Sequence, residues 1–247
     1  MTPTIAEKRR RFAELHREPG CFVMPNPFDV GSAKYLAALG FPALATSSAG
    51  MAFAAGRADG GVSRADALRH ISDLAAAIDC PLNADFEAGF ARDAPLYTLS
   101  EAVDRLRAAR AVIDTSGKTV QLTGRSEAVW RENAGGLPEA LRRLAAYAEA
   151  GAEVLFAPRV KTAEDIAEVV RVAGALPVNV VVDAPGLTRR ELEDLGVKRI
   201  STGAALARAA RGALMHAASD IALNGRFDAF ADIPSSRAIE AAFAPKG

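Results

Sequence analysis

Residues 138–156 read PEALRRLAAYAEAGAEVLF, and this stretch decides the fold class. A helix-length segment ends at Gly151, because glycine can take the left-handed conformation that closes a helix. A short apolar strand, Val154–Phe156, follows it. The same order of helix, glycine and strand recurs around Gly40 and Gly196. A helix–strand unit that is used repeatedly predicts an α/β protein with a parallel sheet.

The same pattern, followed in both directions along the chain, predicts seven strands and eight long helices. The predicted strands are Phe22–Met24, Ala43–Thr46, Leu82–Phe86, Thr119–Leu122, Val154–Phe156, Val178–Val182 and Lys198–Ile200. The predicted helices are Ile5–Arg17, Val30–Leu39, Ser63–Ile78, Leu99–Ile113, Pro138–Ala150, Thr162–Val172, Thr188–Leu195 and Ala204–Ala222. Pro25-Asn26-Pro27 follows the first strand, where a dinucleotide-binding sheet would carry a glycine-rich turn. We therefore expect one domain, residues 1–247, forming a TIM-type (β/α) barrel with seven rather than eight parallel strands.

The composition excludes several classes of protein. The chain has 247 residues with 30 basic and 30 acidic side chains, so its formal net charge is zero, which argues against a general binder of nucleic acid or membrane surfaces. Two cysteines cannot build a disulfide framework, and no stretch approaches the roughly 18 apolar residues of a membrane span. The polar segment Met1–Arg11 also does not have the apolar core of a signal peptide. We expect a cytoplasmic protein with neither a nucleic-acid nor a membrane partner.

Two carboxylates close the third predicted strand. Alternation along a strand places Asn83, Asp85 and Glu87 on one face, at the carboxyl end, where parallel-sheet enzymes carry their chemistry. Two carboxylates on one face repel each other unless a cation or a proton lies between them. Mg²⁺ prefers oxygen ligands and keeps several waters, so the segment predicts a Mg²⁺ site, with Mn²⁺ as the alternative ion. A pair of solvated loop carboxylates is the other interpretation.

An arginine follows the next predicted strand. The same alternation puts Thr123, Arg125 and Glu127 on one face, and an arginine in a barrel mouth must pair because an unpaired buried charge is costly. One interpretation is a bidentate clamp on a substrate carboxylate, and the other is an internal salt bridge to Glu127 or Glu87. Arg125 and Glu127 are our candidate catalytic residues.

Small and amide side chains follow other strands. Ser47, Ser48 and Ala49 have backbone N–H groups that can approach an anionic oxygen of a substrate. Residues 201–203 (STG) precede the last long predicted helix, and backbone N–H groups at such a helix start can likewise bind an anion. Asn179, on the sixth predicted strand, adds an amide for substrate contact.

These segments together resemble the isocitrate lyase/phosphoenolpyruvate mutase family. The motifs that carry the resemblance stand in the family's order: 24–29 MPNPFD, 46–50 TSSAG, 83–89 NADFEAG, 125–128 RSEA, 177–180 PVNV and 199–203 RISTG. The resemblance implies a (β/α)₈ barrel whose last helix is commonly swapped between the subunits of a dimer or tetramer. It also implies Mg²⁺-dependent reactions that make or break C–C or C–P bonds next to a carboxylate, through an enolate-like intermediate.

Residue roles follow from the same resemblance. Asp85 would bind Mg²⁺ directly, and Asp59 and Glu87 would reach the ion through water, with Glu87 standing where many members have aspartate. The residues implied for the substrate are Arg125 for a carboxylate, Ser47, Ser48 and Ala49 for an oxyanion, and Asn179 for a further contact.

The chain departs from the family after Phe90. The family continues with a helix, a fourth strand ending in a metal-site glutamate, and a loop that closes over the substrate and in many lyases carries an acid/base cysteine. Here residues 91–99 (ARDAPLYTL) resemble the stretch after that loop, so about thirty residues, one βα unit, are missing. We expect no eighth strand between Phe90 and Leu99. The strands that carry Asp85 and Arg125 should then either pair directly or leave the barrel split.

The leading hypothesis is a Mg²⁺-dependent lyase that cleaves a C–C bond in a small 2-oxo or 2-hydroxy (di)carboxylate. One alternative is a C–P bond mutase or hydrolase of the phosphoenolpyruvate/phosphonopyruvate type. Another is a catalytically impaired barrel that only binds or assembles. The expected partners are a small carboxylate substrate and further copies of the chain, in a homodimer or homotetramer.

Overall fold

The computed structural model describes residues 2–87, 96–131 and 133–243, and the chain forms two compact units. Unit 1 comprises residues 1–24 and 91–201, and unit 2 comprises residues 25–90 and 202–247. Each unit is therefore assembled from two segments that are far apart in the sequence. A single domain spanning residues 1–247 stays a prediction.

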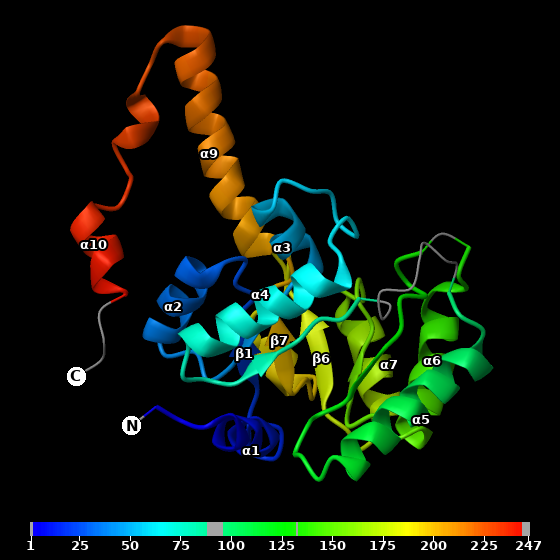
Figure 1. Ribbon diagram of the computed structural model, residues 1–247. Helices are drawn as coiled ribbons and strands as arrows, with labels where there is room; N and C mark the ends of the chain where they lie inside the picture. Colours follow the sequence, from blue (N-terminus) through cyan, green and yellow to red (C-terminus); the bar gives the residue numbers. More distant parts are fainter. Residues whose placement is uncertain (1, 88–95, 132, 244–247) are drawn as a thin grey trace. The chain divides into compact units, whose positions relative to one another are not determined.

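Unit 1 contains a five-stranded parallel sheet in the order β1–β7–β6–β5–β4 (Figure 1). Its strands are β1 (Phe22–Met24), β4 (Thr123–Arg125), β5 (Val154–Phe156), β6 (Val178–Val181) and β7 (Arg199–Ser201). The first strand pairs with the last, with Val23 opposite Ile200. At the other edge Arg125 lies opposite Phe156, which brings the carboxyl ends of β4 and β5 together.

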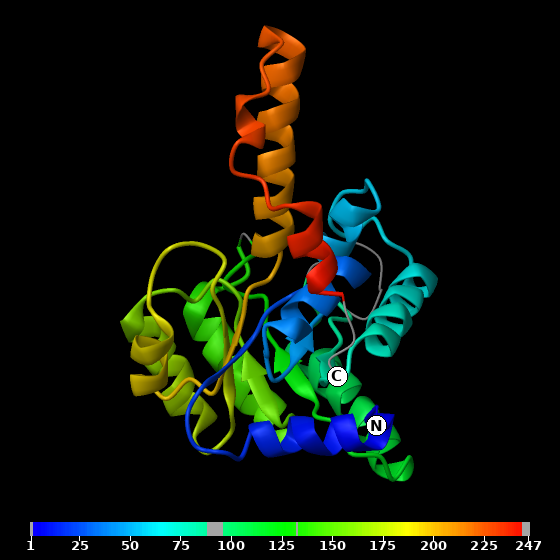
Figure 2. The same cartoon turned by 90° about the vertical axis from the view of Figure 1, so that its left-hand side faces the viewer.

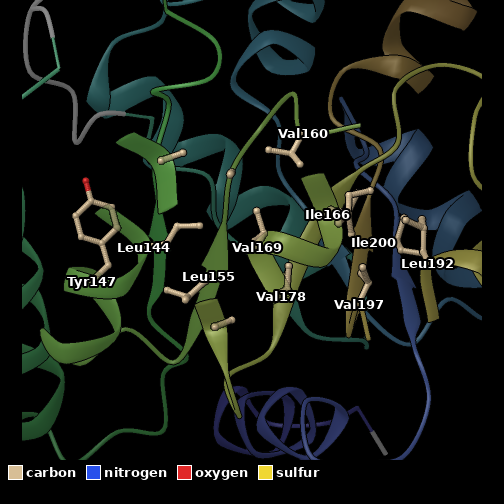
Figure 3. Close-up of a cluster of buried hydrophobic side chains, with 14 of the residues drawn as sticks. Leu144, Tyr147, Leu155, Val160, Ile166, Val169, Val178, Leu192, Val197 and Ile200 are labelled. Atoms are coloured by element: carbon tan, nitrogen blue, oxygen red, sulfur yellow. The ribbon is translucent and has the colours of Figure 1, made fainter. Parts of the chain in front are cut away.

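The helices of unit 1 enclose the main hydrophobic core. They are α1 (Ile5–Leu15), α5 (Leu99–Thr115), α6 (Gly136–Glu149), α7 (Ala163–Ala173) and α8 (Arg189–Asp194). Helix α6 contacts β4, β5 and α7, and α7 contacts β6. Figure 3 shows apolar side chains of these helices and strands gathered in one cluster, among them Leu144, Leu155, Ile166, Val178 and Ile200. Burial of this cluster is the main force that holds the sheet and its helices together.

Unit 2 contains a two-stranded parallel sheet and its own smaller core. Its elements are α2 (Val30–Ala38), β2 (Leu44–Ala45), α3 (Ser48–Ala54), α4 (Arg64–Ala77), β3 (Leu82–Asn83), α9 (Ala205–Asn224), the 3₁₀ helix η1 (Asp228–Phe230) and α10 (Ser236–Ala241). The core joins Ala33, Leu36, Leu44, Leu74 and Ile78. The segment after α9 turns back along that helix (Figure 2).

The predicted fold class is confirmed. Seven parallel strands alternate with helices in the described part of the chain, and β1 and β5 have the bounds that the sequence predicted. Over the same residues the strands form two sheets, β1–β7–β6–β5–β4 in unit 1 and β2–β3 in unit 2, and no ladder joins β3 to β4 or β1 to β2. Residues 88–95, which include most of the stretch where we expect no eighth strand, lie outside the described residues.

The predicted fourth strand, Thr119–Leu122, is wrong: the strand is Thr123–Arg125. The carbonyl of Leu122 accepts the N–H groups of both Glu153 and Val154, and pairing with β5 begins one residue later. The N–H of Leu122 donates to the Glu153 carboxylate (3.1 Å), so a side chain takes the place of a ladder bond. The apolar and β-branched run at 119–122 indicated a strand that this local bonding excludes.

The third strand is shorter than predicted and the segment after β2 is helical. Strand β3 ends at Asn83 because the N–H of Asp85 donates to the Thr46 side chain rather than to a neighbouring strand. The alternation that was expected to put Asp85 and Glu87 on one face therefore does not apply to them. Helix α3 was not predicted, and its first turn contains Ser48.

Bilayer-spanning helices are not found in the part of the chain that the structure describes. No helix there combines the length with the apolar composition that a membrane crossing requires.

Gly124 in β4 is expected to tolerate no side chain. A Cβ there would lie 2.9 Å from the Cβ of Tyr147 and 3.0 Å from that of Ala152, both in the packed core. We expect Gly124→Ala to lower the free energy of unfolding by about 1–3 kcal/mol, the usual cost of overpacking. Gly186→Ala, with nothing within 4 Å of its Cβ, is the control in a urea titration followed by circular dichroism. Equal stability of the two variants would contradict the close approach at β4.

Candidate functional site

Asp85 lies directly after β3 and is held by three backbone or side-chain contacts within unit 2. Its N–H donates to Thr46 Oγ1 (2.8 Å), its Oδ1 accepts the N–H of Glu87 (2.9 Å), and its Oδ2 accepts the N–H of Ser48 at the longer distance of 3.4 Å. Its side chain is half-buried. Bonds to both carboxylate oxygens hold Asp85 in one orientation, as a ligand or general base requires.

Asn26 supports this arrangement from a buried position at the carboxyl end of β1. Its Nδ2 donates to the backbone carbonyl of Thr46 (2.8 Å), and its Oδ1 accepts the N–H groups of Thr202 (2.8 Å) and Gly203 (3.0 Å). The sequence suggested the start of α9 as an anion site. These two N–H groups instead donate to Asn26 in the structure. Sequence reasoning placed Asn26 at a strand end but gave it no role, because its partners are about 20 and 176 residues away.

Glu87 has an unusual backbone conformation. Its φ angle is +50°, in the left-handed region that few non-glycine residues adopt. Such positions cost of order 1–3 kcal/mol and cluster at functional sites. The residue stands two positions after Asp85, and its N–H donates to Asp85 Oδ1, so the strained backbone belongs to the turn that holds the Asp85 carboxylate.

Asp59 does not join Asp85 and Glu87. It is exposed, and its Oδ1 accepts the N–H of the following Gly60 (3.1 Å). Within residues 2–87, 96–131 and 133–243, no three His, Cys, Asp or Glu side chains are grouped to hold a metal ion. Mg²⁺ is commonly bound by one or two carboxylates with water and substrate oxygens completing its shell, so the donor set of Asp85 and Glu87 fits this ion.

Ser47, Ser48 and Ala49 lie at the beginning of α3. Ser47 is the N-cap of this helix, and its Oγ accepts the N–H of Gly50 (3.2 Å). The N–H groups of Ser48 and Ala49 fall in the first turn, where no intrahelical acceptor exists for them. The predicted anion-binding N–H groups are therefore set in a defined turn.

Arg125 forms an ion pair within unit 1. Its Nη2 is 3.2 Å from Glu127 Oε1, and Arg131 Nε is 3.3 Å from Glu127 Oε2. The Arg125 and Glu127 side chains are 22% and 16% exposed, so solvent screens this pair less than an ordinary surface pair. The internal salt bridge, one of the two interpretations of Arg125, is thus present. Binding of a substrate carboxylate by Arg125 stays a prediction.

Asn179 belongs to a buried polar network. Its Oδ1 accepts Arg199 Nε (2.8 Å) and its Nδ2 donates to Ser201 Oγ (3.0 Å). Arg199 also donates to Thr123 Oγ1 (3.2 Å) and faces His16 Nε2 (3.3 Å). A substrate contact by Asn179 would require it to exchange these partners.

Arg199 and His16 were missed by sequence reasoning. Burial lowers the pKa of Arg199 to about 9, and burial together with the charge of Arg199 lowers the pKa of His16 to about 4. No carboxylate pairs with Arg199 among the residues that the structure describes. The only signal in the sequence is a charged residue inside the apolar run of the last strand.

A third group of charged residues follows β5 and β6. Lys161 Nζ donates to Asp183 Oδ1 (2.8 Å), and this hydrogen bond lowers the pKa of Asp183, with a smaller contribution from the charge of Arg159. The Arg159 guanidinium lies 5.3 Å from the centre of the Trp130 ring. Contacts between side chains thus link the loops after β4, β5 and β6.

Comparison with known proteins identifies relatives along most of the chain. The family model described as phosphoenolpyruvate phosphomutase matches residues 12–95 and 91–222. The protein Rv1998c of Mycobacterium tuberculosis is 30% identical over 226 residues, which cover 84% of this chain and 87% of that protein.

Solved structures agree with this match. A crystal structure from Burkholderia cenocepacia J2315 named "putative lyase/mutase" is 38% identical, with a TM-score of 0.92 and 97% of each chain covered. A "putative phosphonomutase" from the same organism is 28% identical, with a TM-score of 0.79 over 87% of this chain and 99% of that one. A structure of 2,3-dimethylmalate lyase, 19% identical with a TM-score of 0.81 over 97% and 95% of the two chains, shares the fold.

The family match falls into two segments that overlap at residues 91–95. This overlap lies in the stretch after Phe90 where the sequence predicts a missing βα unit, which stays a prediction. The two segments together span more than half of the chain, and the motifs around Asp85 and Arg125 fall one in each. The chain belongs to the phosphoenolpyruvate phosphomutase family.

Proposed function

We propose that the protein is a Mg²⁺-dependent carbon–carbon lyase acting on a small 2-oxo or 2-hydroxy (di)carboxylate through an enolate-like intermediate. The observation that carries the proposal is the way Asp85 is held, with Thr46, Ser48 and Glu87 bonded to its backbone or carboxylate directly after a parallel strand. A carboxylate fixed in this manner at a strand's carboxyl end is typical of a catalytic metal site. Membership of the family supports the same class of reaction.

Asp85 and Glu87 are the residues that would hold the metal. Both supply hard oxygen ligands, and Asp59, which is exposed, would act only through water. When bound, Mg²⁺ supplies positive charge that stabilises the negative charge developing on a substrate oxygen. The N–H of Ala49 is assigned to the same oxygen, because an N–H group already fixed in a helix turn needs no reorganisation during the reaction. The N–H of Ser48 would have to exchange its long bond to Asp85 for this oxygen.

Arg125 is assigned to the substrate carboxylate. A guanidinium binds a carboxylate through two parallel hydrogen bonds, which fixes both the position and the plane of the acid. Glu127, paired with Arg125 and Arg131, orients the guanidinium and is in this proposal a positioning residue. The bond that breaks lies next to the carboxylate that Arg125 holds.

A second candidate is a C–P mutase or hydrolase. It is favoured by the description of the matched family model and by the 28% identical structure named a phosphonomutase. The two candidates share the residues assigned above and differ in the bond that breaks, so substrates separate them.

The test is turnover of oxaloacetate, methylisocitrate and phosphonopyruvate with Mg²⁺, for the native chain and Asp85→Ala. A lyase should release pyruvate from oxaloacetate or methylisocitrate, whereas a C–P mutase should convert phosphonopyruvate into phosphoenolpyruvate and a hydrolase should release pyruvate and phosphate from it. We expect metal-dependent turnover, reduced at least about a hundredfold in Asp85→Ala because a direct ligand is lost. Asp232→Ala removes an exposed carboxylate of the same unit and is the matched control. Mn²⁺ binding, followed by electron paramagnetic resonance, should weaken in Asp85→Ala alone.

Absence of metal-dependent turnover with all three substrates would contradict the enzyme proposal. If Mn²⁺ binding were also absent in a folded chain, the impaired barrel that only binds or assembles would be favoured.

We also propose that the chain forms a homodimer or homotetramer through α9 and the segment after it. Only Ala207 is buried along the twenty residues of α9, while Leu214, Met215 and Leu223 are 62%, 68% and 81% exposed. Large apolar side chains exposed along one helix are typical of protein interfaces, and a second copy of α9 offers a surface of the same kind. Sedimentation equilibrium should give a mass above 25.8 kDa, and Leu214→Glu with Met215→Glu should restore the monomer.

A further inference from the structure

The loop after β5 carries an arginine that forms no ion pair with a carboxylate among the described residues, although its charge contributes to the lowered pKa of Asp183. Arg159 is exposed and stands three residues after Phe156, which lies opposite Arg125 in the sheet. Within the described residues the Arg159 guanidinium forms neither an ion pair nor a hydrogen bond. It makes a cation–π contact with the ring of Trp130, whose centre is 5.3 Å away. Trp130 belongs to the loop after β4, so the loop that follows Arg125 also orients Arg159.

The backbone at Arg159 is strained. Its φ angle is +70°, in the region where glycine is the favoured residue and a Cβ is penalised. An exposed contact between a guanidinium and an aromatic ring is a weak interaction, and a glycine would relieve the strain at this position. The fold therefore gives little reason for a long cationic side chain at position 159. Binding of a ligand by this side chain explains its presence better.

The surrounding charges favour an anionic ligand. Lys161 lies two residues further on and pairs with Asp183, so that carboxylate is already engaged by a second cation. Arg159 and Lys161 both follow β5, and Asp183 is the carboxylate that pairs with Lys161. Two cations within three residues of this loop, beside one engaged carboxylate, favour the binding of an anion.

We propose that Arg159 is a second anion-binding residue, which recognises the far acidic group of a dianionic substrate whose first carboxylate is held by Arg125. This inference rests on the proposed function and narrows its substrate to acids with a carboxylate or a phosphonate at both ends. Trp130 holds the guanidinium over its ring, and the planar fork then binds the acid through two hydrogen bonds.

Ligand binding without turnover tests the proposal. Trp130 is the only tryptophan in the chain, so its emission reports on the neighbourhood of Arg159. Succinate and 3-phosphonopropionate carry two acidic groups, with a carboxylate or a phosphonate at the far end, and butyrate carries one. We expect the first two to change Trp130 emission and to bind about tenfold or more tightly than butyrate in isothermal titration calorimetry.

Three variants separate recognition from folding. Arg159→Gln should lose that preference, with about a tenfold weaker affinity for succinate and 3-phosphonopropionate and unchanged affinity for butyrate. Arg159→Gly should lose it too, while its thermal unfolding midpoint equals or exceeds that of the native chain, because the strain at φ +70° is relieved. Arg171→Gln removes an exposed arginine on α7 that pairs with Glu168 and should bind all three acids as the native chain does.

The outcomes decide the matter independently of catalysis. Native affinity for succinate in Arg159→Gln, or unchanged Trp130 emission on saturation, would overturn the proposal. If Arg159→Gly lowers both the thermal unfolding midpoint and the affinity for succinate, the proposal is also overturned, because Arg159 would then have a structural role. If Asp85→Ala leaves turnover intact but Arg159 variants lose dianion binding, the proposed metal chemistry fails and the anion site stands.

Discussion

Replacing Arg199 with alanine is expected to lower the free energy of unfolding by about 4 kcal/mol. The side chain is 2% exposed and lies among the residues that join α1 to the sheet of unit 1. Truncation leaves a cavity, and core truncations of this size cost about 2–5 kcal/mol. It also removes the donors that face Asn179 Oδ1 (2.8 Å) and Thr123 Oγ1 (3.2 Å), and an unsatisfied buried acceptor costs about 1–3 kcal/mol. Removal of a buried charge offsets part of this loss.

Arg199→Met separates volume from hydrogen bonding. Methionine fills most of the space of the arginine stem without supplying a donor, so we expect a loss of about 2 kcal/mol, half that of alanine. Both free energies come from urea unfolding followed by circular dichroism at neutral pH. Equal losses in the two variants would show that the cavity is not the cause. Native stability in Arg199→Ala would show that the buried guanidinium contributes nothing to folding.

The second large effect is a loss of stability in acid that depends on His16. The ring nitrogen Nδ1 lies 2.7 Å from the carbonyl of Phe12, which makes it the protonated nitrogen of the neutral ring, and Nε2 faces the guanidinium of Arg199 at 3.3 Å. A second proton on Nε2 would point at a fixed positive charge. Burial, the charge of Arg199 and the smaller influence of Lys198 lower the pKa of His16 from 6.5 to about 4.

The direction follows from proton binding. Between pH 6.5 and 4 the unfolded chain binds a proton at His16 that the folded chain does not, so acid favours unfolding. A shift of this size corresponds to about 3 kcal/mol, present in full above pH 6.5 and lost as the pH falls to 4.

The measurement is urea unfolding at pH 7 and pH 4.5, for the native chain and His16→Gln. The glutamine side chain does not bind a proton in this pH range, and its oxygen can still accept a hydrogen bond from Arg199. Carboxylates titrate in both proteins, so the difference between the two pH dependences isolates His16. We expect the native chain to lose about 2–3 kcal/mol more than His16→Gln over this range. Parallel pH dependences would contradict the buried neutral ring.

Local chemistry predicted the elements of the fold well. The succession of helices and strands follows from runs of apolar residues closed by glycine, and the predicted helix Thr188–Leu195 is present as α8, with Thr188 and Glu191 forming a capping box at its start. Errors arise where long-range bonding overrides the local pattern. Leu122 donates to a side chain 31 residues away, so the strand begins at Thr123 although 119–122 is the more strand-like run.

The sequence predicted the charged residues of the candidate site. It did not predict the buried polar residues that hold the surrounding structure in place. Asp85 and Arg125 stand out because charged residues at strand ends are few, and the structure keeps each in a bonded, partly buried position. The strand alternation used to place Asp85 beside Glu87 failed, since β3 ends at Asn83. Asn26 and Arg199 went unassigned because only the folded chain shows their partners, which no spacing in the sequence encodes.

The pairing of β1 with β7 has a consequence for how the protein is made. Val23 is synthesised 177 residues before its neighbour Ile200. Until then the apolar edge of the first strand has no partner from its own sheet, and closing so long a loop is slow. An exposed strand edge during that interval is a site for aggregation, so folding yield should depend on protection of the nascent N-terminal segment by a chaperone. The order of strands that completes the sheet therefore also sets when the chain is most vulnerable.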